Sequence, residues 1–258
     1  MTFDRRFGGI DRLFGIANAA RIRKSHVAVV GVGGVGSWAA EALARSGVGK
    51  LTLIDLDHIA ESNINRQVHA VESNLGQAKV LAMRERIHAF YAQCDIVCIE
   101  EFVSPENCAT LLQDDIDAVI DACDQVRAKV SLAAWSMKSG KVFVTSGAAG
   151  GKRLAHLVNV EDMAQVTHDP LLSKMRYQLR KEFGAPRGGQ KMGLTCVLSR
   201  EPISPPDASC GLVGDGSLNC HGYGSIVTVT AAFGLSAAGF VLNQLAFAKP
   251  DAGVKAEN

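Results

Sequence analysis

The 258-residue sequence has almost no net charge, because 27 lysines and arginines stand against 26 aspartates and glutamates, for a balance of +1. This excludes a strong overall field for nucleic acid, so any RNA contact must come from a local basic patch. The seven cysteines include no CxxC pair, and no zinc is expected. Their odd number fits reduced thiols. The N-terminus also lacks the apolar core of a signal peptide, so we expect a cytoplasmic protein.

Charge is missing altogether from residues 225–248, a run long enough to cross a bilayer. The run contains polar side chains, including Thr228, Thr230, Asn243 and Gln244. We therefore favour a core helix of an α/β domain over peripheral or inserted contact with the inner membrane.

The most informative stretch is residues 26–66. An apolar run, HVAVVG, predicts a buried strand, and a helical pattern follows the cluster of Gly31, Gly33, Gly34 and Gly36. A second predicted strand, KLTLIDLD, ends in Asp55 and Asp57. A strand, a glycine turn and a helix N-terminus together form an anion-binding site. A carboxylate at the end of the second strand can accept hydrogen bonds from the hydroxyl groups of a ribose. These features predict a nucleotide, although the glycines alone suit NAD, FAD or ATP equally.

Polar residues downstream favour ATP. Asn63, Arg66 and Lys79 follow the second strand, and two cations near a phosphate loop suit a triphosphate. The alternative is that Arg66 and Lys79 are ordinary surface charges. Asp124 follows a later strand, DIDAVIDACD, where it could hold Mg²⁺ or cap the next helix, and the two roles are compatible.

Residues 171–184 predict a helix with an apolar side formed by Leu172, Met175, Leu179 and Phe183. Its other side is basic and is a candidate tRNA contact, although a solvated helix face is the alternative. The basic residues are Lys174, Arg176, Arg180 and Lys181. Cys220, next to His221 after a loop rich in proline, glycine and serine, is a weak candidate nucleophile because sequence adjacency does not place a base against it. Cys123 is expected in the core.

Three segments carry a family resemblance: GVGGVGSWAAEALARSGVGKLTLIDLDHIAESNINRQ, GQAK and DACDQVRAK. They resemble the ubiquitin-activating-type adenylating enzymes, which include the activators of the molybdopterin and thiamine sulfur carriers. The resemblance covers residues 6–150 and the closing helix. It implies that Asp55 binds the ATP ribose, that Asn63, Arg66 and Lys79 contact the phosphates, and that Asp124 binds Mg²⁺. It also implies a homodimer in which Arg12 or Arg6 of the partner reaches the ATP.

The rest of the chain departs from the sulfur-carrier activators, whose zinc-binding CxxC pairs are absent. Instead, RYQLRKEFG, CVLSREP and GSIVTVTAAFG resemble the branch of tRNA threonylcarbamoyladenosine dehydratases. That resemblance implies ATP-dependent ring closure of the threonylcarbamoyl side chain beside the anticodon, through a carboxyl-adenylate. Because the attack is intramolecular, no enzymic nucleophile is required. Alternatives are adenylation of a ubiquitin-like sulfur carrier, a NAD-dependent oxidoreductase and a non-catalytic scaffold.

These patterns predict one α/β domain over residues 1–258, with a Rossmann-like, mostly parallel open sheet and helices on both faces. We expect residues 1–150 to form the ATP-binding half. Residues 151–258 would form a substrate half with an antiparallel extension and the closing helix. The expected partners are tRNA and a second copy of the chain, and a sulfur-relay protein is a further candidate.

Overall fold

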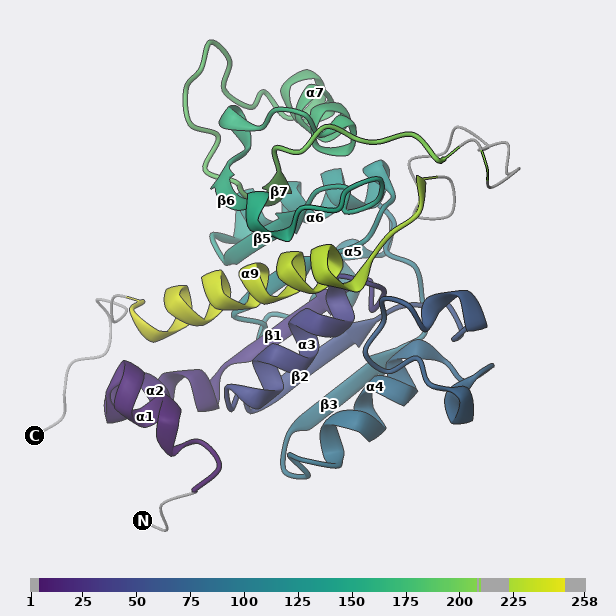
Figure 1. Ribbon diagram of the computed structural model, residues 1–258. Helices are drawn as coiled ribbons and strands as arrows, with labels where there is room; N and C mark the ends of the chain where they lie inside the picture. The colour runs from purple at the N-terminus through teal and green to yellow at the C-terminus, as the bar shows by residue number, and fades with distance from the viewer. Residues whose placement is uncertain (1–4, 208, 210–222, 249–258) are drawn as a thin grey trace, which may run out of the picture.

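A computed structural model describes residues 5–207, 209 and 223–248 (Figure 1). Its centre is a seven-stranded sheet in the order β3-β2-β1-β4-β5-β7-β6. All neighbours are parallel except β6 and β7, which are antiparallel. The prediction of a mostly parallel sheet with an antiparallel extension is therefore confirmed. The strands are β1 (His26–Val30), β2 (Lys50–Ile54), β3 (Asp95–Ile99), β4 (Ala118–Asp121), β5 (Val142–Ser146), β6 (Val158–Asp162) and β7 (Thr195–Ser199).

Helices cover both faces of this sheet. They are α1 (Gly8–Phe14), α2 (Ile16–Lys24), α3 (Gly36–Arg45), α4 (Lys79–His88), α5 (Cys108–Leu111), α6 (Val126–Ser139), α7 (Pro170–Glu182) and α9 (Val227–Ala246). Short 3₁₀ turns are η1 (Glu61–Asn63), η2 (Glu72–Asn74), η3 (Ala155–Leu157) and η4 (Met163–Gln165).

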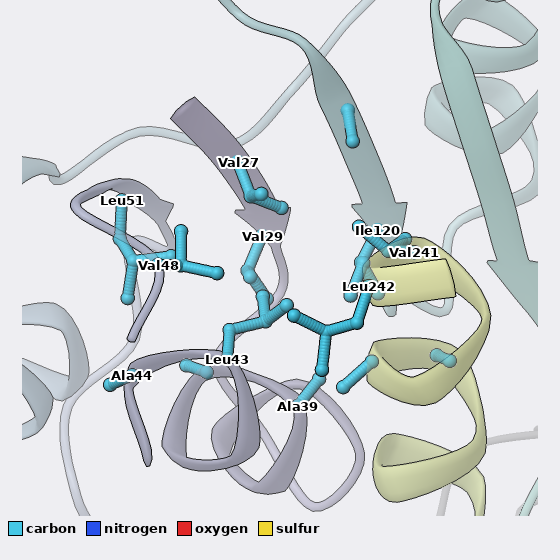
Figure 2. Close-up of a cluster of buried hydrophobic side chains, with 14 of the residues drawn as sticks. Val27, Val29, Ala39, Leu43, Ala44, Val48, Leu51, Ile120, Val241 and Leu242 are labelled. Atoms are coloured by element: carbon cyan, nitrogen blue, oxygen red, sulfur yellow. The ribbon is translucent and has the colours of Figure 1, made fainter. Parts of the chain in front are cut away.

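The alternation of side chains along β1 explains the two layers. Val27 and Val29 pack into one apolar cluster with α3, α4 and α9, whereas Ala28 and Val30 pack into another with α5, α6 and α7. Successive residues of a strand point to opposite faces, so a strand covered on both sides must be apolar throughout. Figure 2 shows the first cluster, with Val27 and Val29 of β1 near Leu43 of α3.

The uncharged run forms α9, which lies against α3 across one face of the sheet (Figure 1). By length and composition the helix is apolar enough to cross a membrane, but 56% of its most apolar eighteen-residue segment is buried inside the protein. The two helices approach closely at Gly234, where an added Cβ would run into the Val35 carbonyl oxygen. This packing agrees with the core-helix interpretation.

One detail of the predicted helix at residues 171–184 is wrong. Leu172, Met175 and Leu179 are buried on one side of α7, but Phe183 is 42% exposed. It lies beyond the last helical residue, at the C-cap, where the chain has left the helical path that would place it on that side.

Candidate nucleotide site

The glycine turn joins β1 to α3 at the point where the strand order reverses. From β1 the chain builds outward through β2 and β3, and then β4 pairs on the other side of β1. Ligands of open α/β sheets bind outside the carboxyl ends of the strands at such a point.

Two glycines of this turn are required by close approach. Gly31 has φ +85°, and a Cβ there would lie 2.9 Å from the backbone of Ala122 after β4. A Cβ on Gly36 would run into the Gly31 carbonyl oxygen. The turn is therefore tight enough to aim the N-terminus of α3 at the crevice, where backbone N–H groups favour an anion.

A pocket opens at this crevice. Its lining comes from residues at or just after the carboxyl ends of β1 to β5 and from α4, α6, α7 and α9. It includes all but one of the glycines of the turn, the predicted polar residues, and several residues that the sequence analysis did not single out. The predicted residues that line it are Gly31, Gly33, Gly34, Asp55, Asp57, Asn63, Arg66, Lys79 and Asp124. The fold thus brings together residues spread over nearly a hundred positions. Gly36 does not line the pocket; it begins α3.

Asp55 is buried at the end of β2, where it holds the glycine turn. Its Oδ2 accepts the Val32 N–H at 2.6 Å and its Oδ1 accepts the Asp57 N–H at 2.9 Å. Burial raises the pKa of Asp55, although the nearby Lys79 and the two backbone donors oppose that rise. Each oxygen of the Asp55 carboxylate can accept one more hydrogen bond, so the group can also accept a hydrogen bond from a ribose hydroxyl.

The two predicted cations are both buried. Lys79, the first residue of α4, has its Nζ 2.7 Å from Oδ2 of Asp57. Arg66 donates through Nη1 to the Ser62 carbonyl at 2.6 Å. Asn63 is also buried, and its Oδ1 accepts the Ala60 N–H at 3.0 Å. These contacts hold the polar side chains in fixed positions, which is inconsistent with free surface charges.

Asp124 is exposed at the pocket after β4. The expectation that it caps the next helix is wrong, because the N-cap of α6 is Gln125, which makes no side-chain capping bond. Within residues 5–207, 209 and 223–248, no group donates a hydrogen bond to the Asp124 carboxylate, and no cluster of three or more His, Cys, Asp or Glu forms a metal cage. One carboxylate beside a phosphate site still fits Mg²⁺, which is often held by one or two carboxylates together with substrate phosphates.

A buried ion pair lies beneath this part of the pocket. Lys129 of α6 contacts Oδ2 of Asp121 at 3.1 Å and donates to the Ser146 carbonyl at 2.7 Å. Burial acts to lower the pKa of this lysine, but Asp121, Cys123 and Asp169 together outweigh burial, so the pKa is raised. Cys123, expected in the core, packs partly buried against the apolar cluster that contains α6, and it also lines the pocket. Burial raises the pKa of its thiol. The network fixes the end of β5 against α6.

The pocket wall formed by residues 146–150 is tied to α7 by Asp169. This residue is the N-cap of α7, and its carboxylate accepts the Ala148 N–H and the Leu172 N–H, both at 2.9 Å. Gly147 must lack a side chain because a Cβ would run into that carboxylate. The first turn of α7 is thus anchored to the nucleotide pocket, and Leu171 lines it.

Sequence reasoning missed Gln67 and Thr230, which also line the pocket. Gln67 is 5% exposed, and its Oε1 has no partner among the described residues. The position of Gln67 next to Arg66 in the sequence could have indicated that it belongs to the site. The sequence gives no such indication for Thr230, because only the packing of α9 on α3 brings it to the pocket.

The remaining predicted residues lie elsewhere. Arg6 and Arg12 are exposed near α1, where Arg6 donates to the Phe90 carbonyl and to Gln93. On α7, Arg176 donates to the Met163 and Val166 carbonyls and Arg180 to the Pro186 carbonyl, whereas Lys174 and Lys181 are exposed. Cys220 lies outside the described residues.

Comparison with known proteins supports the resemblance. Residues 9–251 match the ThiF family model. The chain is 39% identical to the tRNA threonylcarbamoyladenosine dehydratase of Haemophilus influenzae, over 95% of this chain and 94% of that protein. It is also 39% identical to the crystal structure of the Escherichia coli tRNA N6-threonylcarbamoyladenosine dehydratase in complex with ATP, with a TM-score of 0.85 over 93% of both chains. The chain therefore belongs to the ThiF family and, within it, to the tRNA threonylcarbamoyladenosine dehydratases.

Proposed function

We propose that this protein uses ATP to dehydrate N6-threonylcarbamoyladenosine in tRNA, closing the side chain into a ring. The observation that carries the proposal is the single pocket that gathers the glycine turn, Arg66, Lys79 and Asp124 at the switch point of the sheet. The close relatives that share 39% identity over nearly the whole chain bear the name of this activity.

The threonyl carboxylate of the substrate is a poor electrophile, because hydroxide or oxide is a poor leaving group. The substrate carboxylate attacks the α-phosphorus of ATP, the bond from that phosphorus to the bridging oxygen breaks, and diphosphate leaves. The product is an acyl-adenylate whose carbonyl now carries AMP as a good leaving group. An atom of the carbamoyl group in the same side chain then attacks this carbonyl, loses its proton, and expels AMP with one former carboxylate oxygen. The side chain has lost one water overall, and attack within one molecule requires orientation more than a nucleophilic side chain.

The protein's residues bind and orient the nucleotide. Arg66, Lys79 and Asn63 would contact the phosphates, so that positive charge faces the charge that develops as diphosphate departs. Asp55 would accept hydrogen bonds from the ribose hydroxyls of ATP. Asp57 holds Lys79 in place at 2.7 Å. Asp124 would hold Mg²⁺, which when bound neutralises phosphate oxygens and orients them.

We also propose that the chain acts as one adenylating unit and as a homodimer. The proposal of one unit is supported by the sheet, because β6 and β7 from the second half pair directly onto β5. The dimer is supported by α1 and α2, where Leu13 is 76% and Ile16 is 66% exposed beside Arg12. A cytoplasmic location, a sulfur-relay partner and membrane contact stay predictions from the sequence.

The test is AMP release from ATP with tRNA that carries threonylcarbamoyladenosine and with tRNA that lacks it. We expect AMP only with the modified tRNA, together with loss of the mass of one water from the nucleoside. AMP formed only with a ubiquitin-like carrier that ends in Gly-Gly would contradict the proposal and favour carrier adenylation.

A further inference from the structure

We propose that a shallow groove between α6 and α7 binds the anticodon loop of the tRNA, with Tyr177 stacking on a base and Lys174 contacting a phosphate. This inference rests on the proposed function and assigns its substrate a surface. The groove is lined by Val126, Ser173, Lys174, Tyr177 and Gln178.

The position of the groove connects it to the nucleotide pocket. Val126 begins α6 two residues after Asp124, which lines that pocket. On α7, Leu171 also lines the nucleotide pocket, and Lys174 and Gln178 follow it at helical spacing along one ridge. If the threonylcarbamoyl group of the modified adenosine enters the pocket past Leu171, the neighbouring nucleotides of the loop would therefore lie beside Tyr177.

The chemistry of the exposed ridge suits RNA. Tyr177 is 66% exposed, so its ring is open to stacking on a base. Lys174 and Lys181 lie three residues before it and four residues after it, and both are exposed. Single-stranded loops are commonly held by aromatic rings that stack on bases and by cations that contact the backbone.

The structure also separates this ridge from the other basic residues of α7. The guanidinium groups of Arg176 and Arg180 donate to backbone carbonyls of Val166 and Pro186 at 2.8 and 2.9 Å. They hold the segments that flank the helix. The RNA surface is therefore narrower than the basic pattern suggested and is centred on Tyr177.

The test compares variants in the modified-tRNA assay and measures KM for tRNA separately from kcat and from ATP binding. Tyr177→Ala should raise the KM for tRNA about tenfold, as expected for loss of one stacked base, and leave ATP binding unchanged. Tyr177→Phe, which keeps the ring, should behave like the wild type. Lys174→Ala should lower the slope of log KM against log salt by about 0.7. The matched control is Lys138→Ala, since Lys138 is exposed at the far end of α6.

The outcomes distinguish the two proposals. No AMP formation by the wild-type protein with modified tRNA contradicts the proposed function itself. An active wild type whose KM for tRNA does not change in Tyr177→Ala overturns the groove assignment alone. If Tyr177→Ala instead weakens self-association in sedimentation, the groove is a contact between copies of the chain and the RNA assignment is wrong.

Discussion

At the scale of single residues, Asp124 and Asp121 show how position decides the role of a carboxylate. They lie three residues apart, but Asp121 is fully buried against Lys129 and Asp124 is exposed in the pocket. We predict that Asp124→Asn lowers Mg²⁺-dependent AMP formation at least about a hundredfold, since one preorganised charge is lost where charge develops. The free energy of unfolding should change by less than about 0.5 kcal/mol, because the side chain is at the surface.

The matched control for this prediction is Asp114→Asn, which removes an exposed carboxylate away from the pocket. Both variants are measured by AMP release over a Mg²⁺ titration and by denaturant unfolding. An Asp124→Asn protein that keeps its activity and its Mg²⁺ dependence would show that the metal is held by other groups.

His69 is a second residue whose environment makes a measurable prediction. It is 1% exposed, and neither ring nitrogen has a partner among the described residues. Burial, with Lys79 and Arg86 nearby, lowers the pKa of His69 to about 4. The unfolded chain therefore takes up a proton below about pH 6.5 that the folded protein refuses until about pH 4, so stability falls as the pH falls through this window.

We expect this group to contribute a slope of up to about 1.4 kcal/mol per pH unit within that window. His69→Leu should make the dependence of unfolding free energy on pH shallower between pH 6.5 and 4, without abolishing it, because burial also lowers the pKa of His26. Urea unfolding at several pH values measures the slope, and the exposed His156→Leu controls for loss of an imidazole. An unchanged slope in His69→Leu would mean that His69 is protonated in the folded protein.

At the scale of secondary structure elements, the contact between α3 and α9 positions Thr230 at the pocket. A Cβ at Gly234 would lie 2.9 Å from the Ala39 nitrogen and 2.9 Å from Trp38 Cβ, so the helices would have to separate. We predict that Gly234→Ala destabilises the protein by about 1–3 kcal/mol, the usual cost of overpacking. It should also weaken ATP binding, because α9 moves away from the glycine turn.

The same helix offers a control, because an added Cβ at Gly239 would meet nothing within 4 Å. Gly239→Ala should be neutral or stabilising by up to about 1 kcal/mol through helix propensity alone. Thermal unfolding with and without ATP measures both effects. Equal stabilities for the two variants would show that α9 is not held tightly against α3.

The elements of the ATP-binding half could be predicted from local sequence, whereas some contacts of the second half could not. The continuous apolar run and the glycine turn identify β1 and α3 from short-range patterns. The roles of Arg176 and Arg180 depend on carbonyls of flanking segments, and hydropathy cannot show whether an arginine points to solvent or folds back. The sequence could not show whether Asp124 or Gln125 is the N-cap of α6, because sequence patterns do not locate the start of a helix to within one residue.

At the scale of the whole molecule, α9 runs from the nucleotide pocket at its first turn to the N-terminal helix α2 at its last. Thr230 lines the pocket, and Arg21 of α2 donates to the Ala246 carbonyl, sixteen residues further along the helix. That distance is about 24 Å at 1.5 Å per residue. If Arg12 of α1 contacts ATP, we therefore expect it to do so from a second copy of the chain and not from its own.

Mixing two inactive variants tests this arrangement. If Arg12 acts across the dimer, Arg12→Ala and Asp124→Asn should each be nearly inactive, yet a refolded equimolar mixture should recover roughly a quarter of the wild-type activity. Half of the dimers would be mixed, and one pocket in each would combine an intact Asp124 with an intact Arg12 of the partner. A mixture no more active than the two separate proteins would contradict a shared site. If Arg12→Ala alone keeps full activity, the same mixing is repeated with Arg6→Ala, and full activity there as well would show that neither arginine reaches ATP.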